Sequence, residues 1–317
     1  MPKRNAASKT IPPMGIGAYI REIGRGKDGA RPLDRAQAAD LFGQVLDGGL
    51  SDLEVGAFCL AMRIKGETAQ EMAGFLDATH TRMRAIPAGA HDAPPTIVIP
   101  SYNGARKLPV LTPLLALLLA RAGLPVLVHG AATEDKRVFS GAVFAALGVP
   151  PMAQITPIAP GNVAFAPTAL LCPGLQRLLE VRRVVHLRNS GHSVVKLMNP
   201  CAGRSLLVSS YTHPEYAHSM AETFALTGTN ALLLRGTEGE AVADARRAPR
   251  WQAFVKGQAL ALQEGQSGSL SSLPDLPVAI DAANTAAYIR AVLDGAQPLP
   301  EPIAWQVQHL VELSKKI

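Results

Sequence analysis

An Asn-Gly pair and two cations follow an apolar segment at residues 96–107, TIVIPSYNGARK. Residues 97–99 are typical of a buried strand, and the polar residues begin where that strand ends. In an open α/β sheet, ligands bind at this edge, beyond the carboxyl ends of the strands. Guanidinium and ammonium groups bind phosphate oxygens, and an arginine can do so with two parallel hydrogen bonds. The segment therefore predicts an anion-binding loop that includes Arg106 and Lys107.

Positive charge is concentrated around this loop. Residues 93–214 contain eleven basic side chains and three acidic ones; eleven minus three gives +8, whereas the whole chain carries +6. The basic residues are Arg106, Lys107, Arg121, Lys136, Arg137, Arg177, Arg182, Arg183, Arg188, Lys196 and Arg204. Such an excess favours a polyanionic partner, although solvated surface cations give the same composition.

The histidines and cysteines do not form a metal or nucleophile pattern. The histidines in the basic region lack zinc-ligand spacing and are typical of loop or cap residues. They are His129, His186, His192 and His213. The three cysteines are odd in number and widely spaced, so we expect reduced thiols. No GxSxG elbow, Walker loop or Rossmann fingerprint occurs between a predicted strand and a predicted helix.

The first part of the chain has a helical pattern. Three helix starts carry an oxygen-bearing cap and, three residues later, an acid or amide that completes a capping box. These pairs are Asp34 with Gln37, Ser51 with Glu54, and Thr68 with Glu71. We predict a small helical domain at residues 14–92. Residues 1–13 are basic and end in Pro-Pro, which predicts a disordered tail.

After a Pro/Gly-rich boundary, strands and helices alternate, which predicts a mostly parallel central sheet flanked by helices. We expect this larger α/β domain to comprise residues 93–172 and 199–317. The predicted strands are residues 97–99, 126–128, 206–209 and 231–234. The predicted helices begin at residue 112 and span about 135–147, 173–196, 215–226 and 284–293, with a last one ending near 316.

Length and composition indicate a globular protein. The chain has 317 residues, 48% of them hydrophobic, enough for two domains. Its longest apolar stretch, residues 114–120, is far shorter than the roughly 20 residues of a membrane span. No secretion signal pattern opens the sequence. We therefore expect a cytoplasmic location and no membrane partner.

Several segments resemble glycosyltransferase family three, which includes anthranilate phosphoribosyltransferase and the pyrimidine nucleoside phosphorylases. Residues 57–68 are similar to its N-terminal helical domain, and residues 128–130 and 197–200 are similar to its later motifs. Within the family, the sequence resembles the YbiB-type nucleic-acid-binding branch. That resemblance rests on residues 97–107, 189–192, 213–216 and 236–240.

The resemblance implies a homodimer that associates through the small helical domain, with the α/β domain across a cleft. Helices at about 173–198 would join the small domain and bring four arginines to the cleft. These are Arg177, Arg182, Arg183 and Arg188. Because Glu180 alone lies nearby in sequence, we expect local pairing to neutralise one arginine at most. The alternative is that some arginines pack their stems and pair with carboxylates, as in any hinge.

The family's transferases carry a Gly-Thr-Gly-Gly-Asp loop, whose amides approach a pyrophosphate. The corresponding segment here keeps one glycine and gains a bulky tyrosine and two cations, so the resemblance implies a vestigial phosphate cleft. Its residues are Ser101, Tyr102, Asn103, Gly104, His129 and Gly130. The family's magnesium site uses adjacent Asp-Glu, whereas Glu238 and Glu240 are separated by a glycine, which leaves them weak metal candidates. We expect no cofactor, and magnesium only where transferase activity is retained.

The sequence therefore favours a protein that binds DNA, or RNA, mainly through phosphates and with little sequence preference. The predicted contacts are Arg106, Lys107, Lys136, Arg137, Arg177, Arg182, Arg183, Arg188, Lys196 and Arg204. Tyr102 has two interpretations: stacking on a base, which would favour single strands, or loop packing. One alternative is an active pentosyltransferase, either of the anthranilate phosphoribosyltransferase type or nucleoside phosphorylase-like. Another is a sensor that binds a nucleotide or phosphorylated sugar without turnover.

Overall fold

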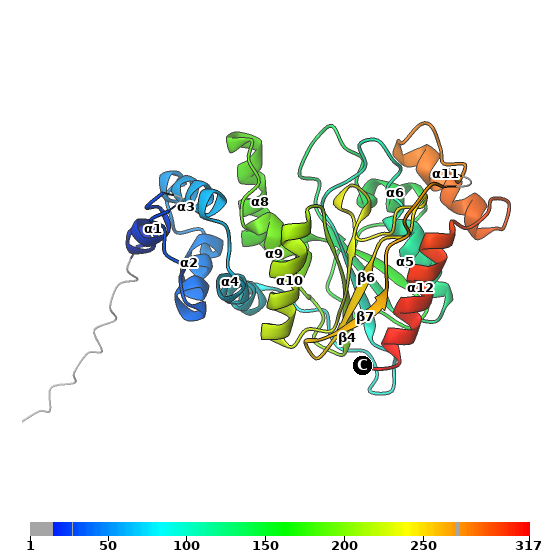
Figure 1. Ribbon diagram of the computed structural model, residues 1–317, viewed down its shortest axis with the longest axis horizontal. Helices are drawn as coiled ribbons and strands as arrows, with labels where there is room; N and C mark the ends of the chain where they lie inside the picture. Colours follow the sequence, from blue (N-terminus) through cyan, green and yellow to red (C-terminus); the bar gives the residue numbers. More distant parts are fainter. Residues whose placement is uncertain (1–14, 27, 271–272) are drawn as a thin grey trace, which may run out of the picture.

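The chain folds into a helical part and an α/β part that lie side by side (Figure 1). The computed structural model describes residues 15–26, 28–270 and 273–317, so the tail predicted at residues 1–13 lies outside the described residues. No helix among the described residues has the length and apolar character needed to cross a membrane.

Four helices form the helical part. They are α1 (Gly17–Ile23), α2 (Arg35–Asp47), α3 (Asp52–Lys65) and α4 (Ala69–Arg82). All three predicted capping boxes are present at the starts of α2, α3 and α4. The buried rings of Phe42, Phe58 and Phe75 pack between these helices, with 4.5 Å between the centroids of Phe42 and Phe75. Local capping and a shared aromatic core thus fix this part of the molecule.

The α/β part is built on a seven-stranded sheet in the order β3-β2-β1-β4-β5-β6-β7. Strands β1 to β5 pair in parallel, whereas β6 and β7 form an antiparallel hairpin at one edge. The strands are β1 (Thr96–Ser101), β2 (Val126–Gly130), β3 (Val163–Pro167), β4 (Ser205–Tyr211), β5 (Ala231–Arg235), β6 (Trp251–Val255) and β7 (Gln258–Gln263). The predicted fold class, a small helical domain with a mostly parallel sheet flanked by helices, is confirmed.

Helices cover both faces of the sheet (Figure 1). Alternate strand residues face two different cores, so Ile97 and Ile99 lie in one and Val98 in the other. The first core is shared with α5 (Thr112–Arg121), α6 (Ser140–Ala146), α11 (Ala282–Leu293) and α12 (Glu301–Ser314). The second is shared with α9 (Gly191–Leu197), α10 (Pro214–Thr227) and the helical part, with α7 (Thr168–Leu171) leading into α8 (Pro173–Val185).

Two predicted helices differ from those observed. Helix α6 begins at Ser140 rather than near residue 135, because Val138 pairs with Ala105 in an isolated bridge and Arg137 donates to the carbonyl of Asn103. The helix predicted at residues 173–196 is divided into α8 and α9. His186 caps α8 with φ of +58°, a left-handed conformation that ends the helix.

Candidate functional site

The loop after β1 is held by a buried carboxylate from the segment that follows β5, at the same edge of the sheet. Glu240, 2% exposed, accepts hydrogen bonds from the backbone N–H groups of Asn103 and Gly104, both at 2.7 Å. Its second oxygen accepts from the hydroxyls of Ser101 at 2.5 Å and Thr112 at 3.0 Å. One side chain thus occupies four donors at the end of β1.

Glu238 occupies the next part of the same loop. Its carboxylate accepts from the backbone N–H of Arg106 at 2.7 Å, of Lys107 at 3.1 Å and of Leu108 at 3.4 Å. Glu238 has φ of +52°, a left-handed backbone that costs a non-glycine residue roughly 1–2 kcal/mol. Together, the carboxylates of Glu238 and Glu240 accept hydrogen bonds from five backbone N–H groups of the loop, so the protein's own negative charge occupies this nest.

Two glycines permit this close approach. Gly104 has φ of +67°, and a Cβ there would lie 2.9 Å from the carbonyl oxygen of Val138. A Cβ at Gly239 would lie 1.9 Å from the side-chain Nδ2 of Asn103. The loop therefore packs closely against Val138 through Gly104, and against the Glu238–Glu240 segment through the Asn103 side chain.

Because both weak metal candidates, Glu238 and Glu240, accept hydrogen bonds from the loop, their oxygens are already engaged. No group of three or more His, Cys, Asp or Glu side chains suited to a metal ion occurs in residues 15–26, 28–270 and 273–317.

Tyr102 packs into the protein. Its side chain is 3% exposed, and its hydroxyl lies 2.8 Å from both His129 Nδ1 and Thr168 Oγ1. Burial raises the pKa of Tyr102 and lowers that of His129 to about 3, so both groups are neutral at neutral pH. Of the two interpretations drawn from the sequence, loop packing is correct. Stacking of Tyr102 on a base is wrong, because the ring has no accessible face.

The predicted vestigial cleft residues do lie together. Ser101 bonds to Ser140 at 2.7 Å, and β1 pairs with β2 through Ser101 and Gly130. A Cβ at Gly130 would lie 2.2 Å from the carbonyl oxygen of Ser101, so only glycine fits there. These contacts join the ends of β1 and β2 into one packed unit.

Arginines gather beside this loop. Glu134 lies 2.8 Å from Arg137 and 2.8 Å from Arg182. Burial, together with the charges of Arg182, Arg137 and Arg63 and against that of Glu134, lowers the pKa of Arg188 to about 10. We call Arg63, Arg137, Arg182 and Arg188 the arginine cluster; within it the acid Glu134 pairs with Arg137 and Arg182.

Ion pairing is more extensive than expected. Arg183 pairs with Asp135 and with Glu180, both at 2.5 Å, while Arg137 and Arg182 share Glu134. Local pairing through Glu180 engages one arginine, Arg183, as expected, whereas the acidic residues that precede α6 fold back onto α8 and add the long-range partners of Arg182 and Arg183. No ion pair or side-chain hydrogen bond links Arg188 to any described residue, and Arg182 Nη1 is buried without a partner in that part of the chain.

The other predicted contacts lie in different places. Arg106, Lys107 and Lys136 are exposed near the loop. Arg177 instead donates to the carbonyl of Leu46 at the end of α2. Arg204 bonds to the carbonyls of Ala93 and Ile317, beside the start of β4 and so at the opposite edge of the sheet. Neither Arg177 nor Arg204 joins the arginine cluster.

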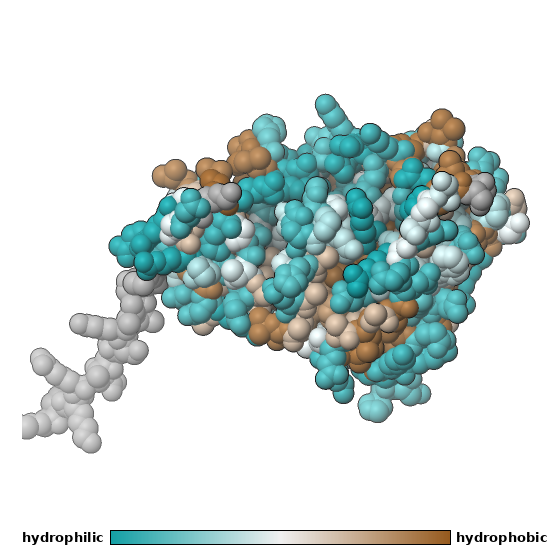
Figure 2. Space-filling view, in the orientation of Figure 1, coloured by the Kyte–Doolittle hydropathy of each residue, from teal (hydrophilic) through white to brown (hydrophobic). Residues whose placement is uncertain are grey.

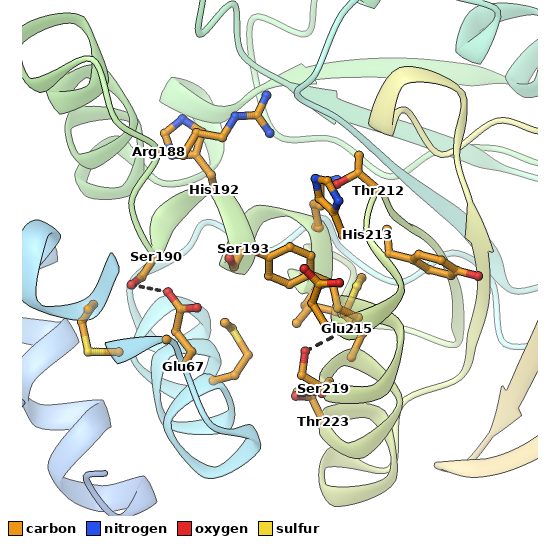
Figure 3. Close-up of a pocket in the computed structure, with 18 of the residues that line it drawn as sticks. Glu67, Arg188, Ser190, His192, Ser193, Thr212, His213, Glu215, Ser219 and Thr223 are labelled. Atoms are coloured by element: carbon orange, nitrogen blue, oxygen red, sulfur yellow. Dashed lines mark hydrogen bonds between the residues drawn. The ribbon is translucent and has the colours of Figure 1, made fainter. Parts of the chain in front are cut away.

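A pocket of about 550 Å³ opens between the helical part and α10 (Figure 3). Its walls come from the end of α3, the start of α4, α9 and the first turns of α10. Arg63, Arg188, His192 and Lys196 line it, and Glu67 bonds to Ser190 at 2.6 Å on its floor. The pocket therefore adjoins the arginine cluster and shares two residues with it.

Lys196 is the most enclosed cation in this wall. Its ammonium donates to the carbonyls of Ser210 and Gly239, both at 3.2 Å. Burial, together with the charge of Arg188 and against that of Glu240, lowers its pKa to about 8.

Sequence reasoning missed Arg63, Glu67, Tyr216 and Ser219 as parts of this site. Arg63 and Glu67 lie outside the basic region of the sequence, and they reach the cleft only because α3 and α4 face α10. The exposed position of Arg63 at the end of a helix is the signal that was available.

An apolar surface lies over α3 and the end of α8 (Figure 2). Leu53, Leu60 and Ile64 on α3 are 83%, 49% and 55% exposed, and Val184 at the end of α8 is 81% exposed. The three α3 residues are spaced by seven and four, which places them on one side of the helix. This surface is separate from the pocket and the arginine cluster.

Comparison with known proteins gives relatives over most of the chain. Residues 18–83 match the family model described as glycosyl transferase family, helical bundle domain. The YbiB protein of Escherichia coli K12 is 42% identical over 301 residues, 91% of each chain. Anthranilate phosphoribosyltransferase of Methylorubrum extorquens PA1 is 29% identical over 217 residues, 66% of this chain and 62% of the relative.

Solved structures share the fold. Anthranilate phosphoribosyltransferase from Thermus thermophilus superposes with a TM-score of 0.72 at 22% identity, covering 94% of this chain and 89% of that chain. The enzyme from Saccharomyces cerevisiae in complex with PRPP and Mg gives a TM-score of 0.69 at 15% identity, covering 94% of this chain and 88% of that chain.

Proposed function

Because the chain belongs to the YbiB-type branch of glycosyltransferase family three, with an anthranilate phosphoribosyltransferase-like fold, we propose that it binds nucleic acid and does not transfer phosphoribosyl groups. Binding is mainly through phosphates and has little sequence preference. The cleft between the helical part and the sheet is the proposed binding surface.

The arginine cluster carries this proposal. Its members come from α3, the loop before α6, α8 and the loop before α9, so the positive charge spans the cleft between the two parts of the molecule. Four arginines against one glutamate leave a local charge of +3. Because neighbouring cations lower the pKa of Arg188, an anion beside it is stabilising, and a phosphate chain supplies such anions in series.

The loop after β1, whose N–H groups already donate to Glu238 and Glu240, favours nucleic-acid binding over phosphoribosyl transfer. In a transferase of this fold, the amides after β1 would have to receive the pyrophosphate of the substrate. Here five of those N–H groups donate to Glu238 and Glu240. A pyrophosphate would have to displace two carboxylates and then face their charge, whereas a polymer needs only the side chains of Arg106, Lys107 and the arginine cluster.

We also propose a homodimer that associates through the apolar surface of α3 and α8. Large exposed apolar side chains at one patch mark interaction sites, and those of α3 lie on one side of the helix. A second copy would double the basic surface and raise affinity through linked sites.

Fluorescence anisotropy with labelled single- and double-stranded oligonucleotides, across a salt series, tests the proposal. The Arg182→Glu, Arg188→Glu variant should weaken binding to all sequences, while the exposed charge reversal Lys316→Glu in the turn after α12 should not. A salt-independent affinity, or no loss in the double variant, would overturn it. A phosphoribosyl pyrophosphate and anthranilate turnover assay tests the enzymatic alternative in parallel.

A further inference from the structure

The pocket beside the arginine cluster has the size and chemistry of a site for one nucleotide. Its volume of about 550 Å³ lies within the roughly 300–1,000 Å³ range of small-ligand sites. Met62, Met72 and Met220 provide apolar wall, while Ser193, Ser219 and Thr223 provide hydroxyl groups. Figure 3 shows Ser219 and Thr223 on α10 across the space from Glu67, with Ser193 on α9 between the two sides.

Nitrogen-bearing side chains face this pocket at the end that adjoins the arginine cluster. His192 is 6% exposed and lines the pocket, yet its Nε2 has no hydrogen-bond partner among the described residues. Lys196 donates to two carbonyls and has no carboxylate partner in that part of the chain. With Arg188, Lys196 gives this wall positive charge that suits a phosphate or another anionic oxygen, while Glu67 and Glu215 contribute carboxylates from the sides of α4 and α10.

An aromatic side chain lies at the pocket's outer wall. Tyr216, in the first turn of α10, is 41% exposed and lines the pocket, with its ring centroid 6.3 Å from that of His213. Accessible aromatic rings serve as stacking surfaces for unpaired bases, whatever the base. The buried ring of Tyr102 cannot serve this role, whereas Tyr216 can.

From the position of this pocket between the arginine cluster and Tyr216, we propose that it receives one unpaired nucleotide of a bound strand, with the base inserted between α4 and α10. This inference rests on the proposed nucleic-acid binding and assigns it a preference for single strands or strand ends. A paired base cannot enter, because insertion requires the nucleotide to leave its stack. The phosphate of the inserted nucleotide lies toward Arg188 and Lys196.

The test compares single-stranded oligothymidine with a duplex of the same length by anisotropy. Ser219→Trp fills the pocket from α10, and Leu226→Trp places the same ring at an exposed position of α10 that does not line the pocket. We expect Ser219→Trp to weaken single-strand binding about tenfold, which corresponds to about 1.4 kcal/mol, and to leave duplex binding unchanged. Leu226→Trp should change neither.

Two further measurements make the outcome decisive. Tyr216→Ala removes an exposed ring and so provides a second test if Ser219→Trp does not fold. It should weaken single-strand binding by a similar factor. Thymidine 5′-monophosphate should compete with oligothymidine on the unmodified protein more strongly than inorganic phosphate at equal concentration. Equal competition by the two anions would overturn base insertion.

The Arg137→Ala, Arg182→Ala variant separates this inference from the function on which it rests, because neither arginine lines the pocket. If that variant weakens binding to both strands while Ser219→Trp and Tyr216→Ala change nothing, base insertion is wrong and nucleic-acid binding stands. If it weakens neither, the proposed function itself fails.

Discussion

The Glu240 carboxylate accepts a hydrogen bond from the backbone N–H of Gly104 at 2.7 Å, although the two residues are 136 positions apart. Backbone N–H groups in a turn after a parallel strand are the usual donors to a bound phosphate. In this chain a buried side chain takes that place. The loop therefore has its anion already, covalently attached to the protein.

Removing that anion should destabilise the fold. Glu240→Ala leaves two buried N–H groups and the Thr112 hydroxyl without their acceptor, which should lower the free energy of unfolding by about 3 kcal/mol. Glu238→Ala should cost about 1 kcal/mol, because water can reach the exposed amides of Arg106 and Lys107. Urea unfolding of both variants measures the difference in the free energy of unfolding. Equal decreases in the two variants would show that the buried Glu240 contacts stabilise the fold no more than the exposed Glu238 contacts.

Transferase turnover should be absent. With phosphoribosyl pyrophosphate, magnesium and anthranilate, we expect no loss of anthranilate fluorescence, because the amides that would hold the pyrophosphate are occupied. The Thermus thermophilus enzyme of the same fold provides the positive control. Turnover in the usual range of about 1–10³ s⁻¹ would establish the enzymatic alternative instead.

Arginines at the two edges of the sheet should behave differently. Arg182→Ala should lower the slope of log affinity against log salt by about 0.7–0.9, the effect of one lost phosphate contact. Arg204→Ala should leave the slope unchanged, because Arg204 bonds to the carbonyls of Ala93 and Ile317 at the opposite edge. A larger slope change for Arg204→Ala would move the binding surface to that edge.

Nucleic-acid affinity should fall as pH rises through about 8. Burial and Arg188 lower the pKa of Lys196 to about 8, so its ammonium loses its proton above that pH and its attraction to phosphate with it. Arg188, with a pKa of about 10, stays charged over the same range. Lys196→Met should abolish the pH dependence between pH 7 and about 9. An unchanged pH profile in Lys196→Met would assign the titration to another group.

Charge on α3 should separate the proposed dimer. Leu60→Asp with Ile64→Asp places two carboxylates on the apolar surface of α3, and sedimentation equilibrium should then give the monomer mass. Val278→Asp introduces the same side chain at a fully exposed position in the α/β part and should leave the mass unchanged. A monomeric parent protein would refute the dimer without bearing on the cleft.

Sequence patterns predicted the fold well where the signal is local. The capping boxes gave the starts of α2, α3 and α4, and apolar runs gave β1, β2, β4 and β5. Strand β3 and the hairpin of β6 and β7 were not predicted. The β7 strand is largely exposed, so it has no buried run to detect.

The site was predicted less completely, because its contacts join distant segments. Arg182 and Glu134 are 48 positions apart, and Glu238 bonds to Arg106 across 132. The sequence identified the loop, most of the arginine cluster and the split acidic pair, but no spacing rule links an acid to the amides it will meet in the fold. Arg63 joins the cluster only through the packing of α3 beside the cleft.

Because Glu238 and Glu240 are part of the chain, the conformation of the loop does not depend on the concentration of a phosphate ligand. A loop that waits for a diffusing phosphate is ordered only in the fraction of molecules that hold one, and that fraction varies with metabolite concentration. In this chain Glu238 and Glu240 are tethered at fixed effective concentration, so every folded molecule presents Arg106 and Lys107 on the same rigid turn. The conformation of this turn therefore stays the same when metabolite concentrations change.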